Sequence, residues 1–220
     1  MTNGSPSRIP TLRDCMYGQA VGDALGVPYE FLSRGTFECT GMVGHGSHDQ
    51  PAGTWSDDTS MALATCDSIR ATGRVDVRDM RERFVRWYRE GAYTASGLFD
   101  VGGTTADALS SGHGCAGERD NGNGSLMRIL PLAFADATDD EVSAVSTITH
   151  AHAISCETCV RMVRVARRLI AGEGLRDAAG DFVGVPASRS APAALYWTPN
   201  APPCGALPTP RATPSACSRR

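Results

Sequence analysis

The sequence predicts an all-α fold, because every segment with a clear apolar period shows helical spacing and several of these segments begin with helix-capping residues. Ser56 precedes one apolar run, and Thr138 with Glu141 forms a capping box ahead of another. At 220 residues the chain is long enough for one domain with a substantial core. We therefore expect one helical domain over residues 1–175.

Three helices are expected in the first half of the chain. The first spans residues 11–25, where Gly18, Gly22 and Gly26 leave a flat strip and Asp23 serves as a capping or paired carboxylate. The second continues from the acidic residues after Ser56 to about residue 71. The third spans residues 76–90 and is expected to place its apolar positions in the core, namely Met80, Phe84, Trp87 and Tyr88.

The second half is expected to contain a short helix at 104–109 and longer ones at 138–151 and 155–171. Residues 33–53 are rich in Gly and His and have no clear period, so we expect a surface loop. His45 and His48 in that loop are interpreted as polar loop residues rather than metal ligands.

The composition excludes several classes of function. All 21 basic residues are Arg and none is Lys, which rules out a Walker-type phosphate loop and a Schiff base. The net charge of −3 gives no footprint for nucleic acid. No apolar run is long enough to span a membrane, and the N-terminus lacks the apolar core of a signal peptide, so a cytoplasmic location is expected.

Residues 56–59 gather four oxygen-bearing side chains ahead of an apolar run. A helix cap needs one such side chain, and acidic residues in the first turn also complement the helix dipole. Ser56, Asp57 and Asp58 could in addition supply several ligands to Mg²⁺ or Ca²⁺. Both interpretations, cap and metal site, stay open at this point.

Two further motifs carry alternatives. Asn121, Gly122, Asn123 and Gly124 form a turn whose backbone N–H groups, at a helix start, suit a phosphate or a ribose hydroxyl, although a plain tight turn explains the pattern equally well. The eight cysteines are interpreted mainly as buried thiols. Cys156 and Cys159 form a lone C-x-x-C, so a zinc or redox protein is kept as a weaker alternative.

Five ordered motifs together resemble the ADP-ribosylglycohydrolase family, and look closest to bacterial members akin to the dinitrogenase reductase-activating glycohydrolase. They are GQAVGDALGVPYE at 18–30, QPAGTWSDDTSMALA at 50–64, FDVGGTT at 99–105, NGNGSLMRILPL at 121–132 and THAH at 149–152.

The resemblance implies a compact orthogonal helical bundle with two Mg²⁺ ions, which hydrolyses the bond between the anomeric carbon of ADP-ribose and a protein side chain, usually arginine. Carried over residue by residue, it makes Ser56, Asp57 and Asp58 metal ligands, with the two carboxylates taking part in catalysis. Glu30 becomes the acidic catalytic residue near the ribose, on a mobile loop. Asn123, Gly124, Ser125 and Met127 line the ADP-ribose cleft, and His150 lies beside the phosphates or adenine. The partner is an ADP-ribosylated protein or a small ADP-ribosyl substrate, and we expect a monomer.

The sequence departs from the family pattern after about residue 175. The second metal motif of the family, of the form D-D-T-D-T or D-x-D-T, does not occur, so one magnesium half-site at most is expected, and the last helices are expected to be missing. Residues 176–220 hold most of the prolines and are expected to form a disordered tail. A two-base shift across 195–210 permits codons for a segment resembling the family's penultimate helix. We therefore hypothesise a frameshift between about 175 and 195, and keep a non-catalytic ADP-ribose-binding remnant as the alternative function.

Overall fold

The computed structural model describes residues 9–182, and this part of the chain is helical, with two isolated β-bridges as its only extended pairings. Its α-helices are α1 (Leu12–Gly26), α2 (Asp57–Thr72), α3 (Val77–Glu90), α4 (Gly103–Ser111), α5 (Asp139–Ser146), α6 (Ala153–Ile170) and α7 (Leu175–Ala178). Five short 3₁₀ helices connect them: η1 (Val27–Tyr29), η2 (Gly46–His48), η3 (Leu126–Arg128), η4 (Leu130–Phe134) and η5 (Ala179–Phe182). None of the described helices has both the length and the apolar character needed to cross a membrane.

The predicted all-α class is confirmed, and the predicted helices occur with small shifts at their ends. Ser56 caps α2, and Thr138 with Glu141 forms the predicted capping box of α5. The helix predicted to reach residue 151 instead ends at Ser146. Beyond that residue the backbone pairs with Cys115, which donates to the Thr149 carbonyl at 2.9 Å and accepts from the Ala151 N–H at 2.7 Å. These bonds compete with continuation of the helix.

Two other expectations are corrected. Residues 126–134 form the short 3₁₀ helices η3 and η4 rather than the start of a longer helix, because Pro131 lies in the first turn of η4 and cannot donate a hydrogen bond. The segment predicted as a tail begins with α7 and η5, and Ala178 is buried. The rest of that segment, including the residues of the hypothesised frameshift beyond 182, lies outside the described residues.

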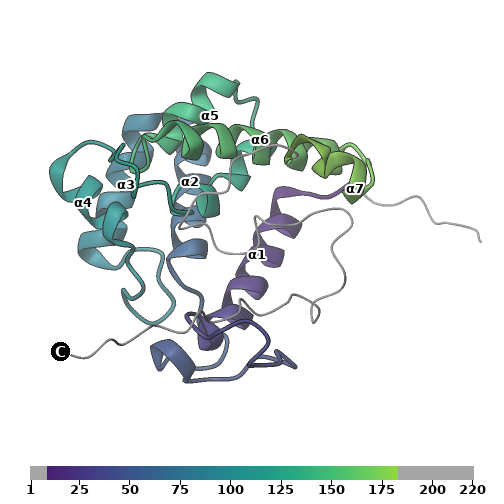
Figure 1. Ribbon diagram of the computed structural model, residues 1–220. Coiled ribbons are helices and arrows are strands. Elements are labelled where there is room, and N and C mark those ends of the chain that lie inside the picture. Colours follow the sequence, from purple (N-terminus) through teal and green to yellow (C-terminus); the bar gives the residue numbers. More distant parts are fainter. Residues whose placement is uncertain (1–8, 183–220) are drawn as a thin grey trace, which may run out of the picture.

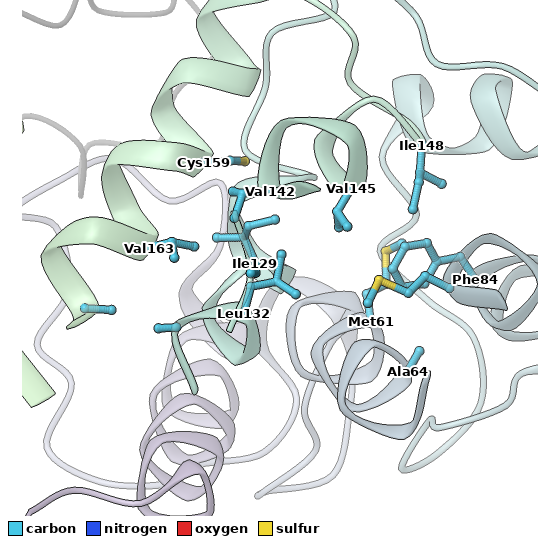
Figure 2. Close-up of a cluster of buried hydrophobic side chains, with 14 of the residues drawn as sticks. Met61, Ala64, Phe84, Ile129, Leu132, Val142, Val145, Ile148, Cys159 and Val163 are labelled. Atoms are coloured by element: carbon cyan, nitrogen blue, oxygen red, sulfur yellow. The ribbon is translucent and has the colours of Figure 1, made fainter. Parts of the chain in front are cut away.

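The helices cross at large angles around one core. In Figure 1, α6 runs across the view while α1 and α2 run down it. Figure 2 shows the core side chains that α2, α3, α5 and α6 direct toward η3 and η4. Met80, Phe84 and Trp87 are fully buried as predicted, and Tyr88 packs against the cluster from its edge. This core holds α2 and the 121–134 segment in fixed relative positions.

A buried cation, Arg128, lies within this core. Its guanidinium is 4.4 Å from the centroid of the Phe84 ring and donates to the carbonyls of Gly124 at 2.9 Å and Val145 at 3.3 Å. Burial lowers the pKa of Arg128 to about 10. Arg128 therefore links the turn at Gly124 to α5 through hydrogen bonds made within the core.

A close approach of η1 and η2 sets the position of the loop residues near Glu30. Gly46 has a φ of +67°, and a Cβ on this residue would lie 2.2 Å from the carbonyl oxygen of Pro28. Ser47 donates through its hydroxyl to the carbonyl of Glu30. Only glycine permits both this backbone conformation and this contact.

We expect Gly46→Ala to destabilise the protein by about 2–3 kcal/mol, because the added methyl group must displace the η1 backbone. Urea unfolding would measure the free energy of unfolding. Gly41→Ala is the matched control, since no atom lies within 4 Å of a Cβ at that position. Equal stabilities for the two variants would contradict the role assigned to the close approach.

Candidate active site

The N-terminus of α2 is held by a carboxylate from α1. Asp23 accepts hydrogen bonds from the Ser56 N–H at 3.1 Å and the Ser56 hydroxyl at 2.8 Å. It also accepts from the Thr59 N–H at 3.0 Å and the Thr59 hydroxyl at 2.6 Å. Asp23 thus caps α2 from another helix, which agrees with the capping role predicted for it.

Ser56 is the N-cap residue of α2, and its hydroxyl also accepts a hydrogen bond from the Asp58 N–H at 3.2 Å. The capping interpretation of residues 56–59 is therefore confirmed for Ser56. The side chains of Asp57 and Asp58 are not used in this way. Neither carboxylate accepts a hydrogen bond from any residue within 9–182, although Asp57 is only 7% exposed.

Asp57 and Asp58 belong to a carboxylate cluster that also includes Glu30 and Asp100. Burial raises the pKa of Asp57 well above its ordinary value, and the charges of Asp58 and Asp100 raise it further. Burial, followed by the charges of Asp23 and Glu30, raises the pKa of Asp58 to about 7. The pKa of Glu30 also rises to about 7, through burial and the charge of Asp100. Such a cluster binds protons or cations strongly.

His48 contacts this cluster directly. Its Nε2 lies 2.6 Å from Glu30 Oε2 and 3.8 Å from Asp100 Oδ1, and its side chain is only 13% exposed. The sequence pattern predicted a polar loop residue rather than a metal ligand at this position. His45 fits that description better, since its side chain is exposed and its Nδ1 lies 2.6 Å from Asp49 Oδ1.

Gln19 joins the carboxylate cluster to the 121–127 turn. Its amide Nε2 donates to the carbonyl of Asp58 at 3.1 Å and to the carbonyl of Met127 at 2.8 Å. One amide nitrogen therefore joins the two motifs that the sequence predicted as metal site and substrate cleft. Gln19 was not among the predicted site residues.

The predicted substrate residues lie together, but they do not all face outward. Asn123 is half-buried, and its carbonyl accepts from the Met127 N–H at 3.0 Å. A Cβ on Gly124 would lie 2.5 Å from His150 Cε1, so the turn and the imidazole are in close contact. Ser125 is fully buried, and its hydroxyl accepts from Ser146 at 2.9 Å. The side chain of Ser125 therefore supports the turn from within.

His150 is a buried, neutral imidazole in this arrangement. Its Nδ1 lies 2.8 Å from the hydroxyl of Thr149, and its side chain packs against Gly124. Burial, followed by the charge of Arg128, lowers the pKa of His150 to about 4. His150 would carry no positive charge near neutral pH.

The zinc or redox alternative at Cys156 and Cys159 receives no support within the described residues. Cys159 is fully buried and its thiol donates toward Ser125 Oγ at 3.4 Å, and burial raises its pKa. The described residues offer one group of three clustered metal-ligating side chains, and it contains neither cysteine. Cys156 instead lines an open hollow of about 660 Å³ between α5 and α6, away from the carboxylate cluster.

Asp100, His48 and Gln19 are the residues of this site that sequence reasoning missed. Asp100 lies inside the FDVGGTT motif, so the motif itself was the available signal. Its φ of +52° is unusual for a non-glycine residue. Gln19 lies inside the motif at 18–30, and His48 lies just before the motif at 50–64. These positions were the only sequence signals for the two residues.

Comparison with known proteins decides the family. The family model for ADP-ribosylglycohydrolase matches residues 5–202, which is most of the chain. The chain belongs to the ADP-ribosylglycohydrolase family. The chain is 34% identical over 173 residues to the ADP-ribosylarginine hydrolase Tri1 of Serratia proteamaculans, covering 73% of this chain and 47% of that protein.

Two further comparisons agree. The chain is 34% identical to the ADP-ribosyl-[dinitrogen reductase] glycohydrolase of Rhodospirillum rubrum, covering 72% of this chain and 58% of that protein. A solved structure, described as an ADP-ribosylglycohydrolase-related protein complex, matches with a TM-score of 0.62 and 31% identity, covering 75% of this chain and 59% of that one. The chain thus spans about half the length of the curated relatives it matches.

We expect Asp23→Ala to destabilise the protein by about 2–3 kcal/mol, because four donors at the start of α2 lose their acceptor. Chemical denaturation would measure the free energy of unfolding. The exposed Asp107 of α4 provides a control, and Asp107→Ala should change stability by less than about 0.5 kcal/mol. A similarly small change in Asp23→Ala would show that the cap is unimportant.

The raised pKa of Asp58 predicts a pH-dependent stability. The folded state retains a proton up to about pH 7, whereas the unfolded chain loses it near the ordinary value of 3.8. Stability from this group is therefore present at acidic pH and lost as the pH rises through about 7. In EDTA, we expect Asp58→Asn to be close to wild type at about pH 4 and more stable by roughly 2–3 kcal/mol at about pH 8. A stability difference that does not change with pH would exclude this titration.

Proposed function

We propose that this ADP-ribosylglycohydrolase removes ADP-ribose from a modified arginine side chain, using a magnesium ion held by Ser56, Asp57 and Asp58. The observation that carries the proposal is the pair of carboxylates at the start of α2. Asp57 and Asp58 are desolvated, crowded by like charges and hydrogen-bonded to no described residue. A hard cation bound by these oxygens would offset the desolvation, reduce the repulsion between like charges and take the place of hydrogen-bond donors.

The three side chains fit Mg²⁺ in ligand type, but they supply only part of its coordination shell. Two carboxylates and one hydroxyl supply fewer than the roughly six oxygen ligands that Mg²⁺ prefers, so water or substrate hydroxyls must supply the others. The Ser56 hydroxyl already donates to Asp23 and accepts from Asp58, so it can offer the ion only its remaining lone pair. When bound, the ion would polarise the anomeric centre and lower the pKa of a coordinated water.

Glu30 is the residue best suited to proton transfer. A carboxyl group with a pKa of about 7 can both accept and return a proton near neutral pH. In the hydrolysis, the oxygen of water bonds to the anomeric carbon while the bond from that carbon to the guanidinium nitrogen breaks. Glu30 would take one proton from the attacking water and pass it to the leaving nitrogen, while the other proton stays on the new anomeric hydroxyl.

Arginine as the modified residue is supported by charge and by the relatives. A guanidinium leaving group is cationic, and the carboxylate cluster would supply negative charge to attract it. The Serratia relative is named an ADP-ribosylarginine hydrolase. The diphosphate would contact the Asn123 to Met127 turn and the neutral imidazole of His150.

Calorimetry with ADP-ribose, in Mg²⁺ and in EDTA, tests the site. We expect binding that depends on Mg²⁺, and loss of this dependence in Asp57→Asn, because the amide lacks the charge that holds the ion. Asp136→Asn, an exposed carboxylate outside the cluster, should bind as wild type does.

Turnover of ADP-ribosyl-arginine separates the enzyme from the alternative function. Metal-dependent binding without turnover would support a non-catalytic ADP-ribose-binding protein. Metal-independent turnover that persists in Asp57→Asn would refute the proposed metal site.

A further inference from the structure

Large apolar side chains flank the candidate active site on two loops. We call them the apolar rim: Phe31, Leu32, Leu98 and Phe99. The first pair directly follows Glu30, and the second directly precedes Asp100. Phe31 is 84% exposed, and both leucines are exposed as well. Contact with water is unfavourable for side chains of this size, and several exposed ones beside one site are typical of a surface that binds a partner.

The rim forms one surface, although it comes from two loops. The rings of Phe31 and Phe99 both contact the imidazole of His48, with centroid distances of 5.5 Å and 5.3 Å. The Ser96 hydroxyl, in the loop of Phe99, donates to Gln50 Oε1 at 2.6 Å. Both loops are therefore held against the segment that carries His48. A surface that is already ordered loses less entropy when it binds a partner.

Phe31 adopts a backbone conformation that its side chain does not favour. Its φ is +62°, in the left-handed region, where a bulky residue is an outlier and glycine is unstrained. Backbone strain and an exposed aromatic ring thus occur together at one residue. Neither feature stabilises the folded chain, whereas strained residues cluster at sites that bind ligands.

The charge beside the rim suits a basic partner. The loops at 27–50 and 91–102 contain four carboxylate side chains and one Arg. Two of these carboxylates, Glu30 and Asp100, adjoin the rim directly. Negative charge of this kind repels anionic lipid headgroups and nucleic acids, whereas it attracts a protein surface that presents arginine.

We propose that the apolar rim is a docking surface for folded proteins that carry ADP-ribosyl-arginine, and that it binds apolar side chains next to the modified residue. This inference rests on the proposed function, because the modified arginine must enter the carboxylate cluster while the rim contacts its surroundings. Free ADP-ribosyl-arginine has no neighbouring side chains, so the rim adds nothing to its binding. The rim therefore selects among protein substrates by the residues around the modified arginine.

Two carrier proteins provide the probe. They are identical folded proteins, each ADP-ribosylated on one surface arginine, which is flanked by leucines in one carrier and by serines in the other. In Mg²⁺, we expect the full chain to bind the leucine carrier at least about tenfold more tightly than the serine carrier. The dissociation constant is the measurement, or the initial-rate kcat/KM if the chain hydrolyses the carriers.

Variants of the rim assign the preference to these side chains. A double variant, Leu32→Ser with Leu98→Ser, should lose the preference for the leucine carrier and bind ADP-ribose within about twofold of wild type. Leu175→Ser changes an exposed leucine of α7 and is the matched control, which should keep the preference. Phe31→Gly should also lose the preference while its Tm stays equal or rises, because glycine relieves the backbone strain.

The outcomes separate this inference from the proposed function. Equal binding of the two carriers by the wild-type chain, or an unchanged preference in the folded double variant, would overturn the docking surface and leave the proposed function intact. Equal losses for ADP-ribose and for the leucine carrier would also overturn it, because the variants would then act on the active site itself. A wild-type dimer in sedimentation that the double variant abolishes would show that a second copy covers the rim instead. A chain that binds neither carrier nor ADP-ribose would refute the proposed function and the docking surface together.

Discussion

The hydrogen bonds from Ser56 and Thr59 to Asp23 are the constraint on which the site depends. Two backbone N–H groups and two hydroxyls at the start of α2 donate to one carboxylate of α1. The next two side chains, Asp57 and Asp58, take no part in this cap, and neither carboxylate accepts a hydrogen bond from any residue within 9–182. Asp23 has its oxygens committed to these bonds, so it contributes charge to the site but is not available as a ligand without releasing the cap. The fold therefore separates a structural carboxylate from the two that are proposed as metal ligands.

This arrangement stores unfavourable electrostatic energy in the metal-free protein. Glu30, Asp57, Asp58 and Asp100 come from α2 and from two loops, and they have little water to screen them. At acidic pH protons relieve the repulsion, and at neutral pH a cation can do so. Binding of a cation would then stabilise both the site and the fold, because the bound state removes a cost that the unfolded chain does not carry.

Much of the fold could be predicted from the sequence because helical periods and caps are local signals. Thr138 and Glu141 specify the start of α5 on their own, and the spacing of Met80, Phe84 and Trp87 specifies the buried face of α3. Asp57 and Asp58 were recognisable because they adjoin a predicted helix. His48 and Asp100 were not, since they lie in loops without a period and their meeting depends on positive-φ positions such as Gly46 and Asp100 itself. Ser125 was predicted to line the cleft, yet its hydroxyl bonds to Ser146, a contact between distant segments that no local pattern encodes.

The turn at residues 121–127 offers a diphosphate a different electrostatic environment from the one its sequence motif suggested. The helix-start argument requires a helix with an aligned dipole, and η3 has only three residues. His150 is neutral, with a pKa of about 4, so it contributes a hydrogen bond rather than a charge. The fixed positive charge is Arg128, buried directly beneath Gly124 and paired with carbonyls rather than with a carboxylate. In a region of low dielectric constant its charge acts strongly on the turn, and Asp57 is the carboxylate that interacts with it electrostatically. Gln19 of α1 connects this turn to the carboxylate cluster, because its amide nitrogen donates to the carbonyls of both Met127 and Asp58.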